Sequence, residues 1–178
     1  MIAYDLQSKT FLLSGKTYSY CMYINRAGLL QHLYWGKKIG AEDAAFLVAA
    51  HGLPAEPDPN DWNMDMATDG MPQELGSFGR GDFRPATVIA RREDGAAMSR
   101  FMYVSHKIVK GALSLVGMPC ARKADETLVI TLKDELSDIE IDLHYAVSED
   151  SDILVRNTAV RNAGKDAAEI AKAFSFCT

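Results

Sequence analysis

Hydrophobic and polar residues alternate with a period of two along most of this chain, as in strands with one buried and one exposed face. Segment 138–147 shows this most clearly, because every second position is apolar: Ile139, Ile141, Leu143, Tyr145 and Val147. The positions between them, His144 among them, are expected to face solvent. A β-branched run at 127–132 precedes this segment across a turn-forming stretch. We therefore predict that the two runs form a hairpin with a longer loop.

The same pattern recurs elsewhere and sets the expected fold class. We expect further strands at 17–24, 29–36, 86–92, 100–109, 152–164 and 168–176. Only residues 40–52 indicate a helix, because they are rich in alanine, carry acidic residues in the first turn and end at a glycine. Short strands separated by turn signals, without alternating helices, predict an all-β fold. The expected architecture is an antiparallel β-sandwich with one short helix and one long loop.

Composition and charge narrow the classes of partner. A chain of 178 residues is long enough for one domain with a sizeable core. Its net charge of −5, with lysine and arginine scattered, argues against a nucleic-acid surface. No apolar run has the length of a membrane span, and the first residues lack an export signal. Cys21, Cys120 and Cys177 are too few and too far apart for a disulfide framework or metal cluster. We expect a cytoplasmic protein with free, mostly buried thiols.

The titratable residues show no catalytic or metal-binding pattern. The four histidines lack the spacing of metal ligands. The carboxylates lie mostly in expected turns or on strand faces, where they are solvated, so no catalytic pair stands out. We expect no metal and no cofactor. The tripeptide Arg80-Gly81-Asp82 matches a cell-adhesion signal, but a chain without an export signal does not display it outside a cell. We interpret it as a chance match at a structural corner.

Residues 54–81 interrupt the alternation, with several proline-rich and glycine-rich turns and many Asp and Asn residues. A long loop in a compact domain is usually functional or disordered. Within it, Trp62 either packs into the core or is exposed as a platform for a sugar or a partner. At its exit, Asp82 and Arg84 share a face of an extended chain, so they either bind one polar ligand or form an ion pair that holds the loop. Trp35, in contrast, is expected to pack in the core.

Five phrases, in order and spacing, resemble a known domain family. They are LLQHLYWGKKI, MPQELGSFGRGDFRPATV, FMYVSHKIVKG, ETLVITLKD and LHYAVSEDSDILVRNTAVRNAG. Together they resemble the N-terminal domain of bacterial α-galactosidases of glycoside hydrolase family 36, from about Tyr18 to the end of the chain. The most specific pieces are residues 81–85 and the strand that carries Arg156, Arg161 and Asn162.

This resemblance implies an antiparallel β-supersandwich, consistent with the alternation above. Members of the family cleave terminal α-linked galactose from melibiose, raffinose and related oligosaccharides, with retention of configuration. The resemblance places the aspartate nucleophile and the aspartate acid/base in a (β/α)₈ barrel that follows this domain. These residues would lie beyond Thr178, so we assign no catalytic residue and expect the 178-residue chain alone to be inactive. The strand-like ending AFSFCT also favours a fragment of a longer enzyme.

The resemblance also suggests what the domain does. In the family it packs on the barrel, and many members are tetramers in which a loop of a neighbouring N-terminal domain helps close the substrate pocket. We expect a homo-oligomer in which residues 54–84 supply that loop. Trp62, Asp82 and Arg84 are then the expected substrate-binding residues, by stacking and by hydrogen bonds to galactosyl hydroxyls. The alternative interpretation is a free-standing carbohydrate-binding or subunit-assembly module.

Overall fold

The computed structural model of the chain describes residues 1–50, 72–79, 84–114, 117 and 120–176. Its elements are β1 (Ile2–Asp5), β2 (Thr10–Ser14), β3 (Tyr18–Ile24), β4 (Leu30–Lys37), α1 (Ala41–Ala50), β5 (Val88–Arg92), β6 (Phe101–Lys110), β7 (Glu126–Asp134), β8 (Ile139–Val147), β9 (Val155–Asn162) and β10 (Ala168–Ala173). Strands dominate, and the predicted all-β class is confirmed. Among the described residues, no helix is long and apolar enough to cross a membrane.

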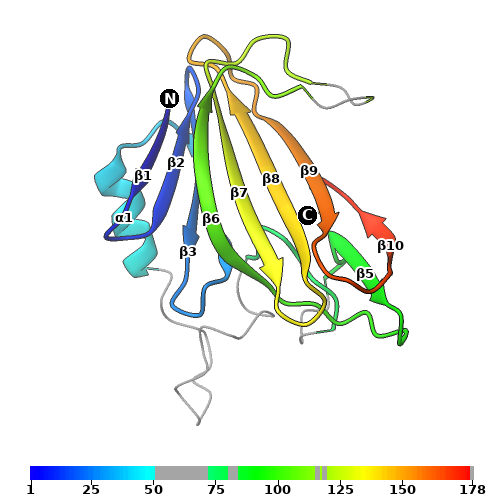
Figure 1. Cartoon of the computed structure of the whole chain (residues 1–178). Helices are drawn as coiled ribbons and strands as arrows, with labels where there is room; N and C mark the ends of the chain where they lie inside the picture. The colour runs from blue at the N-terminus through cyan, green and yellow to red at the C-terminus, as the bar shows by residue number, and fades with distance from the viewer. Residues whose placement is uncertain (51–71, 80–83, 115–116, 118–119, 177–178) are drawn as a thin grey trace.

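The strands form two four-stranded antiparallel sheets and one two-stranded antiparallel pair. The first sheet has the order β1-β2-β3-β4, the second has the order β6-β7-β8-β9, and β10 pairs with β5. The two larger sheets lie one behind the other, with α1 outside the first sheet and the β5–β10 pair beside β9 (Figure 1). The predicted hairpin corresponds to β7 and β8, which pair from Glu126 opposite Val147 to Lys133 opposite Glu140.

Segment 72–77 lies between the first sheet and β5. Gln73 forms an isolated antiparallel bridge with Gln31 of β4, and Ser77 forms a parallel bridge with Val88 of β5. Two backbone hydrogen bonds fix its ends, from His32 N to Pro72 O at 2.8 Å and from Thr87 N to Gly76 O at 2.9 Å. Part of the expected long loop is therefore held like a short strand, which matters for the site described below.

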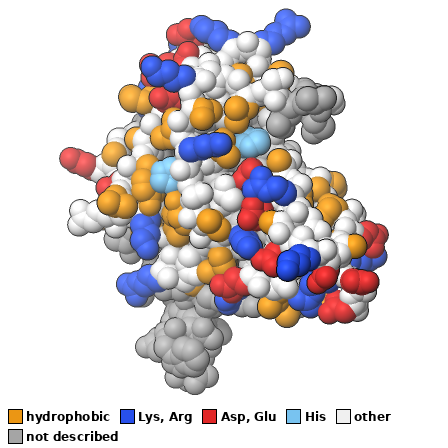
Figure 2. Space-filling model, viewed as in Figure 1, with side chains coloured by type: hydrophobic (Ala, Val, Ile, Leu, Met, Phe, Trp, Pro, Cys, Tyr) orange, Lys and Arg blue, Asp and Glu red, His pale blue; other side chains and the backbone are white. Residues whose placement is uncertain are grey.

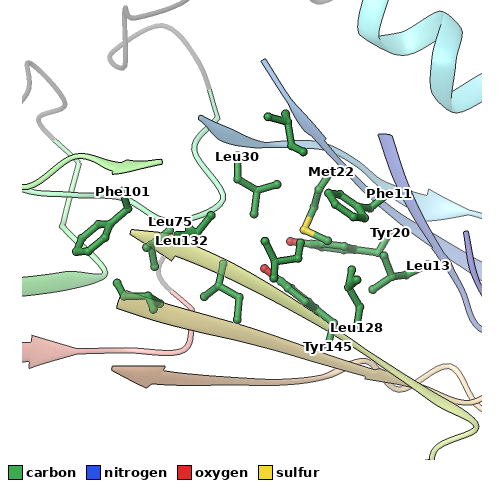
Figure 3. Close-up of a cluster of buried hydrophobic side chains, with 14 of the residues drawn as sticks. Phe11, Leu13, Tyr20, Met22, Leu30, Leu75, Phe101, Leu128, Leu132 and Tyr145 are labelled. Carbon is green, nitrogen blue, oxygen red and sulfur yellow. The ribbon is translucent and has the colours of Figure 1, made fainter. Parts of the chain in front are cut away.

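The main core lies between the two sheets. It combines side chains from β2 and β3 with side chains from β7 and β8, including Phe11, Leu13, Tyr20, Met22, Leu128, Leu132 and Tyr145 (Figure 3). All five apolar positions predicted to be buried on β8 are buried. His144 and Ala146, predicted to face solvent, are also buried. This part of the prediction is wrong because β8 is a central strand, on which Val129 and Thr127 of β7 lie directly beside them.

A smaller cluster lies between the first sheet and α1. It contains Leu12, Cys21, Tyr23, Leu33 and Ala44. The predicted helix is confirmed, and its first turn has the expected acidic residues. There Asp43 Oδ2 accepts a hydrogen bond from Gly40 N at 2.9 Å, and its negative charge suits the N-terminal end of the helix dipole.

The cysteines only partly follow the prediction of buried thiols. Cys21 is buried in the cluster under α1, and burial raises the pKa of its thiol to about 12. Cys120 is exposed, which contradicts the prediction for that residue, and Cys177 lies outside the described residues. Cys120 lies in the connection between β6 and β7 and belongs to neither core cluster.

The face seen in Figure 2 is the outer side of the second sheet. Hydrophobic side chains lie over its left and central part, and charged side chains of both signs gather at the right, over β5 and β10 (Figure 2). On this sheet Arg161 of β9 pairs with Glu140 and Asp142 of β8. Because these pairs join neighbouring strands on one face, they support the register of β8 and β9.

We predict that shortening a buried side chain on the central strand β8 destabilises the fold. Leu143 is fully buried, so Leu143→Ala should lower the free energy of unfolding by about 2–5 kcal/mol, through lost apolar burial and a residual cavity. Leu136→Ala is the matched control, because Leu136 is 49% exposed and its truncation should cost less than about 0.5 kcal/mol. Urea denaturation followed by circular dichroism measures both, and equal losses would contradict this assignment of the core.

Candidate functional site

A cavity of about 350 Å³ opens where segment 72–77 meets the two sheets. Its lining comes from β3, β4, segments 72–76 and 84–87, β9 and the C-terminal Phe176. These elements are far apart in sequence, and pairing of segment 72–77 with β4 and β5 brings them together. Its volume is at the small end of the range for ligand pockets, about 300–1,000 Å³.

A buried carboxylate, Glu74, forms the floor of the cavity. Its Oε1 accepts hydrogen bonds from the hydroxyls of Tyr20 of β3 at 2.9 Å and Tyr145 of β8 at 2.8 Å. Arg156 of β9 donates to the same oxygen from Nη1 at 2.5 Å, and its Nη2 donates to the backbone carbonyl of Glu74 at 2.8 Å. Figure 3 shows Tyr20 and Tyr145 approaching from opposite sheets with their hydroxyl ends close together. Glu74 therefore connects both sheets through one carboxylate.

Aromatic rings enclose the guanidinium of Arg156. Its central carbon lies 5.1 Å from the ring centre of Tyr145 and 5.3 Å from that of Phe176, both within the range of cation–π attraction. The side chain of Arg156 is only 9% exposed. A buried cation of this kind is tolerated because Glu74 neutralises it and the rings stabilise its charge.

The surroundings hold Glu74 in its ionised form. Burial by itself raises the pKa of the carboxyl, but His32, Arg156 and the two tyrosine hydroxyls outweigh burial, so the pKa lies below its ordinary value. Nδ1 of His32 is 3.6 Å from Oε2. Burial, together with the same carboxylate, raises the pKa of Tyr20 and of Tyr145. Both tyrosines therefore stay protonated, as the hydrogen bonds that they donate require.

Trp35 lies at the mouth of this cavity and not in the core, which contradicts the prediction. Its side chain is 59% exposed, and its ring makes an edge contact with Tyr20 at a centroid distance of 5.6 Å. The reason is a bulge at Leu33 of β4: Tyr34 lies opposite Cys21, but His32 lies opposite Met22. The extra residue reverses the alternation, so Trp35 shares a face with Tyr20 instead of lying under α1.

The structure locates one of the three sequence-predicted site residues. Arg84 is exposed and lines the cavity. Trp62 and Asp82 lie outside the described residues, so their contacts and the Asp82–Arg84 pair stay predictions. The expected corner at Arg80-Gly81-Asp82 lies outside the described residues, and Pro85, which follows it, precedes β5 by three residues.

Sequence comparison assigns the family. Residues 28–178 match the family described as the glycosyl hydrolase family 36 N-terminal domain. The chain belongs to this family. The resemblance inferred from the five phrases is thereby confirmed, and the match covers most of the described strands.

The similar proteins are α-galactosidases. The chain is 31% identical over 180 residues to the bifunctional alpha-galactosidase/sucrose kinase AgaSK of Mediterraneibacter gnavus, covering 99% of this chain and 19% of that protein. It is 32% identical to alpha-galactosidase AgaA of Geobacillus stearothermophilus, covering 98% of this chain and 25% of that protein. The chain thus spans a fifth to a quarter of the length of these relatives.

Solved structures show the same relationship. The galactosidase domain of AgaSK superposes with a TM-score of 0.85 at 31% identity, over 97% of this chain and 25% of that one. The family 36 α-galactosidase AgaB from Geobacillus stearothermophilus superposes with a TM-score of 0.81 at 30% identity, over 98% of this chain and 24% of that one. The expected sandwich of the family 36 N-terminal domain is therefore shown by both sequence and fold.

Sequence reasoning missed the central residues of this family 36 domain's cavity. Glu74 lies in the segment interpreted as a loop, where a carboxylate is usually solvated. A signal was present for Arg156, because it lies opposite Tyr145 on the inward face of β9, where alternation predicts an apolar side chain.

Among the described residues, no three His, Cys, Asp or Glu side chains are grouped to hold a metal ion.

We predict that Glu74→Gln strongly destabilises the domain at neutral pH. The amide keeps the shape but removes the charge that neutralises buried Arg156, so the free energy of unfolding should fall by about 3–5 kcal/mol. Glu135→Gln, which breaks the surface pair with Arg100, is the matched control and should cost less than about 1 kcal/mol.

The pH dependence of stability in wild type and in Glu74→Gln tests the charge of Glu74. Because its folded pKa lies below the ordinary value of 4.5, its stabilisation is complete above that pH and is lost as the pH falls through the lowered pKa. In urea titrations from about pH 7 to about pH 3, the gap between wild type and Glu74→Gln should stay constant and then shrink below about pH 4.5. A gap that does not change with pH would show that the ionised form has no special role.

Proposed function

We propose that this chain is the non-catalytic N-terminal domain of an α-galactosidase that hydrolyses terminal α-galactosides of the melibiose and raffinose type. In this proposal a (β/α)₈ catalytic domain follows it in the same protein and packs against it. One observation supports this proposal most directly. Nearly the whole chain is 31–32% identical to α-galactosidases, and it spans only a fifth to a quarter of their length. A similar share of the AgaA structure solved with raffinose is covered, at a TM-score of 0.80.

The chemistry of the cavity supports a non-catalytic role. Retaining glycoside hydrolysis needs two carboxyl groups about 5–5.5 Å apart, one of which must donate a proton. Glu74 is the only carboxylate among the described residues that line the cavity. Its pKa is lowered, and its oxygens accept bonds from Tyr20, Tyr145 and Arg156. Such a carboxylate is a poor proton donor, and its bonded oxygens are poorly placed to act as a nucleophile.

The proposal assigns a binding role to residues 54–84. They would help close the substrate pocket of a neighbouring subunit in a homo-oligomer, with Trp62 stacking on a sugar and with Asp82 and Arg84 bonding galactosyl hydroxyls. The position of Arg84 supports this, because the residue is exposed at the surface just before β5.

A second candidate is a carbohydrate-binding or subunit-assembly module that works without a barrel. The exposed indole of Trp35 beside a cavity favours it, since sugar-binding modules use such platforms. Hydrolysis of an α-galactoside by the full-length protein separates the two candidates. The first candidate requires this activity, and a free-standing binding module has no catalytic domain to provide it.

We predict that the 178-residue chain alone does not hydrolyse p-nitrophenyl α-galactoside. The cavity has no second carboxylate among its described residues, and the proposed nucleophile and acid/base belong to the barrel. Release of p-nitrophenol is the measurement, with a mock purification as the control. The full-length protein should release it readily, and activity of the isolated chain clearly above the mock would overturn the non-catalytic assignment.

We predict that Trp62→Ala in the full-length enzyme raises the KM for raffinose about tenfold, which corresponds to about 1.4 kcal/mol of lost binding. The reason is loss of a stacking surface for the sugar, so kcat should change much less than KM. Phe46→Ala is the matched control, because Phe46 is an exposed aromatic residue on α1. A KM unchanged in Trp62→Ala would assign Trp62 to packing instead.

A further inference from the structure

Two residues that line the cavity each carry a buried hydrogen-bond donor that has no partner among the described residues. The donors are Nε of Arg156 and Nε2 of Gln73. The other two nitrogens of the Arg156 guanidinium bond Glu74, which fixes the plane of the group. Buried polar groups in folded proteins are nearly always hydrogen-bonded, so two such donors on residues that line one cavity indicate a ligand that offers oxygen acceptors.

The mouth of the cavity carries a large aromatic surface that the fold holds in place. Trp35 contacts Tyr20, and the hydroxyl of Tyr20 is anchored on Glu74. The orientation of the indole is thus tied to the buried network, although most of its surface is exposed. An exposed indole on a cavity whose lining includes Gln73 and Arg156 suits a ligand with one apolar face and a polar rim.

The floor of the cavity carries no net charge. Glu74 and Arg156 neutralise each other within the cavity wall, at 2.5 Å. The ligand therefore needs to bring neither a cation nor an anion to satisfy the floor. A volume of about 350 Å³ admits a small ligand, such as one or two sugar rings.

From these observations we propose that this cavity is a saccharide-binding site of the domain itself. One sugar ring stacks its C–H face on Trp35, and its oxygens accept hydrogen bonds from Gln73 and Arg156. The inference rests on the proposed function only for the choice of galactosides as probes. It adds a site that involves neither Trp62 nor Asp82.

Titration of the ¹⁵N-labelled 178-residue chain with galactose, melibiose and raffinose tests the proposal. The indole signal of Trp35, assigned with Trp35→Phe, and the side-chain amide signal of Gln73 should shift with one common, saturable curve in the millimolar range, up to about 100 mM sugar. Glycerol at the same concentration is the control for a non-specific additive. Absence of saturation, or equal shifts with glycerol, would overturn the proposal.

Variants then locate the bound sugar. Trp35→Ala should weaken binding at least tenfold, and Gln73→Leu, which keeps size but removes the donor, at least threefold. Phe46→Ala should leave binding unchanged, and thermal unfolding of each variant confirms that it is folded. Binding unaffected by both Trp35→Ala and Gln73→Leu would place the sugar elsewhere and refute the site.

The outcome is separable from that of the proposed function. Galactoside binding by the chain, with no hydrolysis by the full-length protein, would retain this site and reject the α-galactosidase assignment. Hydrolysis by the full-length protein, with no binding by the folded chain, would reject this site alone.

Discussion

One buried ion pair, between Glu74 and Arg156, connects the parts of this domain. Glu74 comes from a segment between β4 and β5, and its partners come from β3, β8 and β9. Burying two charges is costly, and the interior compensates only when each oxygen and nitrogen is well bonded. Two tyrosine hydroxyls and two of the three guanidinium nitrogens provide most of these bonds, whereas Nε of Arg156 has no partner among the described residues. Segment 72–77 lies beside β5 in the structure, and in this position its carboxylate reaches all of these partners.

The bulge in β4 extends this network to the surface, because it places the exposed ring of Trp35 against Tyr20. Without the extra residue at Leu33, the alternation would direct Trp35 toward α1 and away from Tyr20. With it, Leu33 and Tyr34 both lie on the helix side, while His32 and Trp35 lie on the side of the cavity. A single local irregularity thus places an aromatic platform at the mouth of a polar cavity. Bulges often re-aim side chains near functional sites in this way.

The parts of the fold that were predictable are those governed by local sequence. The inward face of β8 follows from alternation, and the helix at α1 follows from its alanine content and end signals, because each pattern depends on neighbours in sequence. The position of Trp35 could not be predicted, since a bulge leaves no mark in composition and inverts every later position of the strand. Glu74 could not be predicted either, because its burial depends on partners 54, 71 and 82 residues away. Arg84 was singled out because it lies two residues from Asp82 on an extended chain; the structure places it on the cavity, and its contact with sugar stays a prediction, as do those of Trp62 and Asp82.

The floor and the mouth of the cavity have different physical roles, and this separates folding from binding. Glu74, Tyr145 and Arg156 belong to the core network, so substitutions there change stability first and binding only as a consequence. Trp35 and Arg84 are exposed at the mouth, where loss of a side chain removes little buried area. An effect of these two residues on sugar affinity therefore reports contact with the ligand and not loss of the fold. The rigid floor in turn spares a ligand the cost of ordering its site, because the donors are already held by bonds that the fold requires.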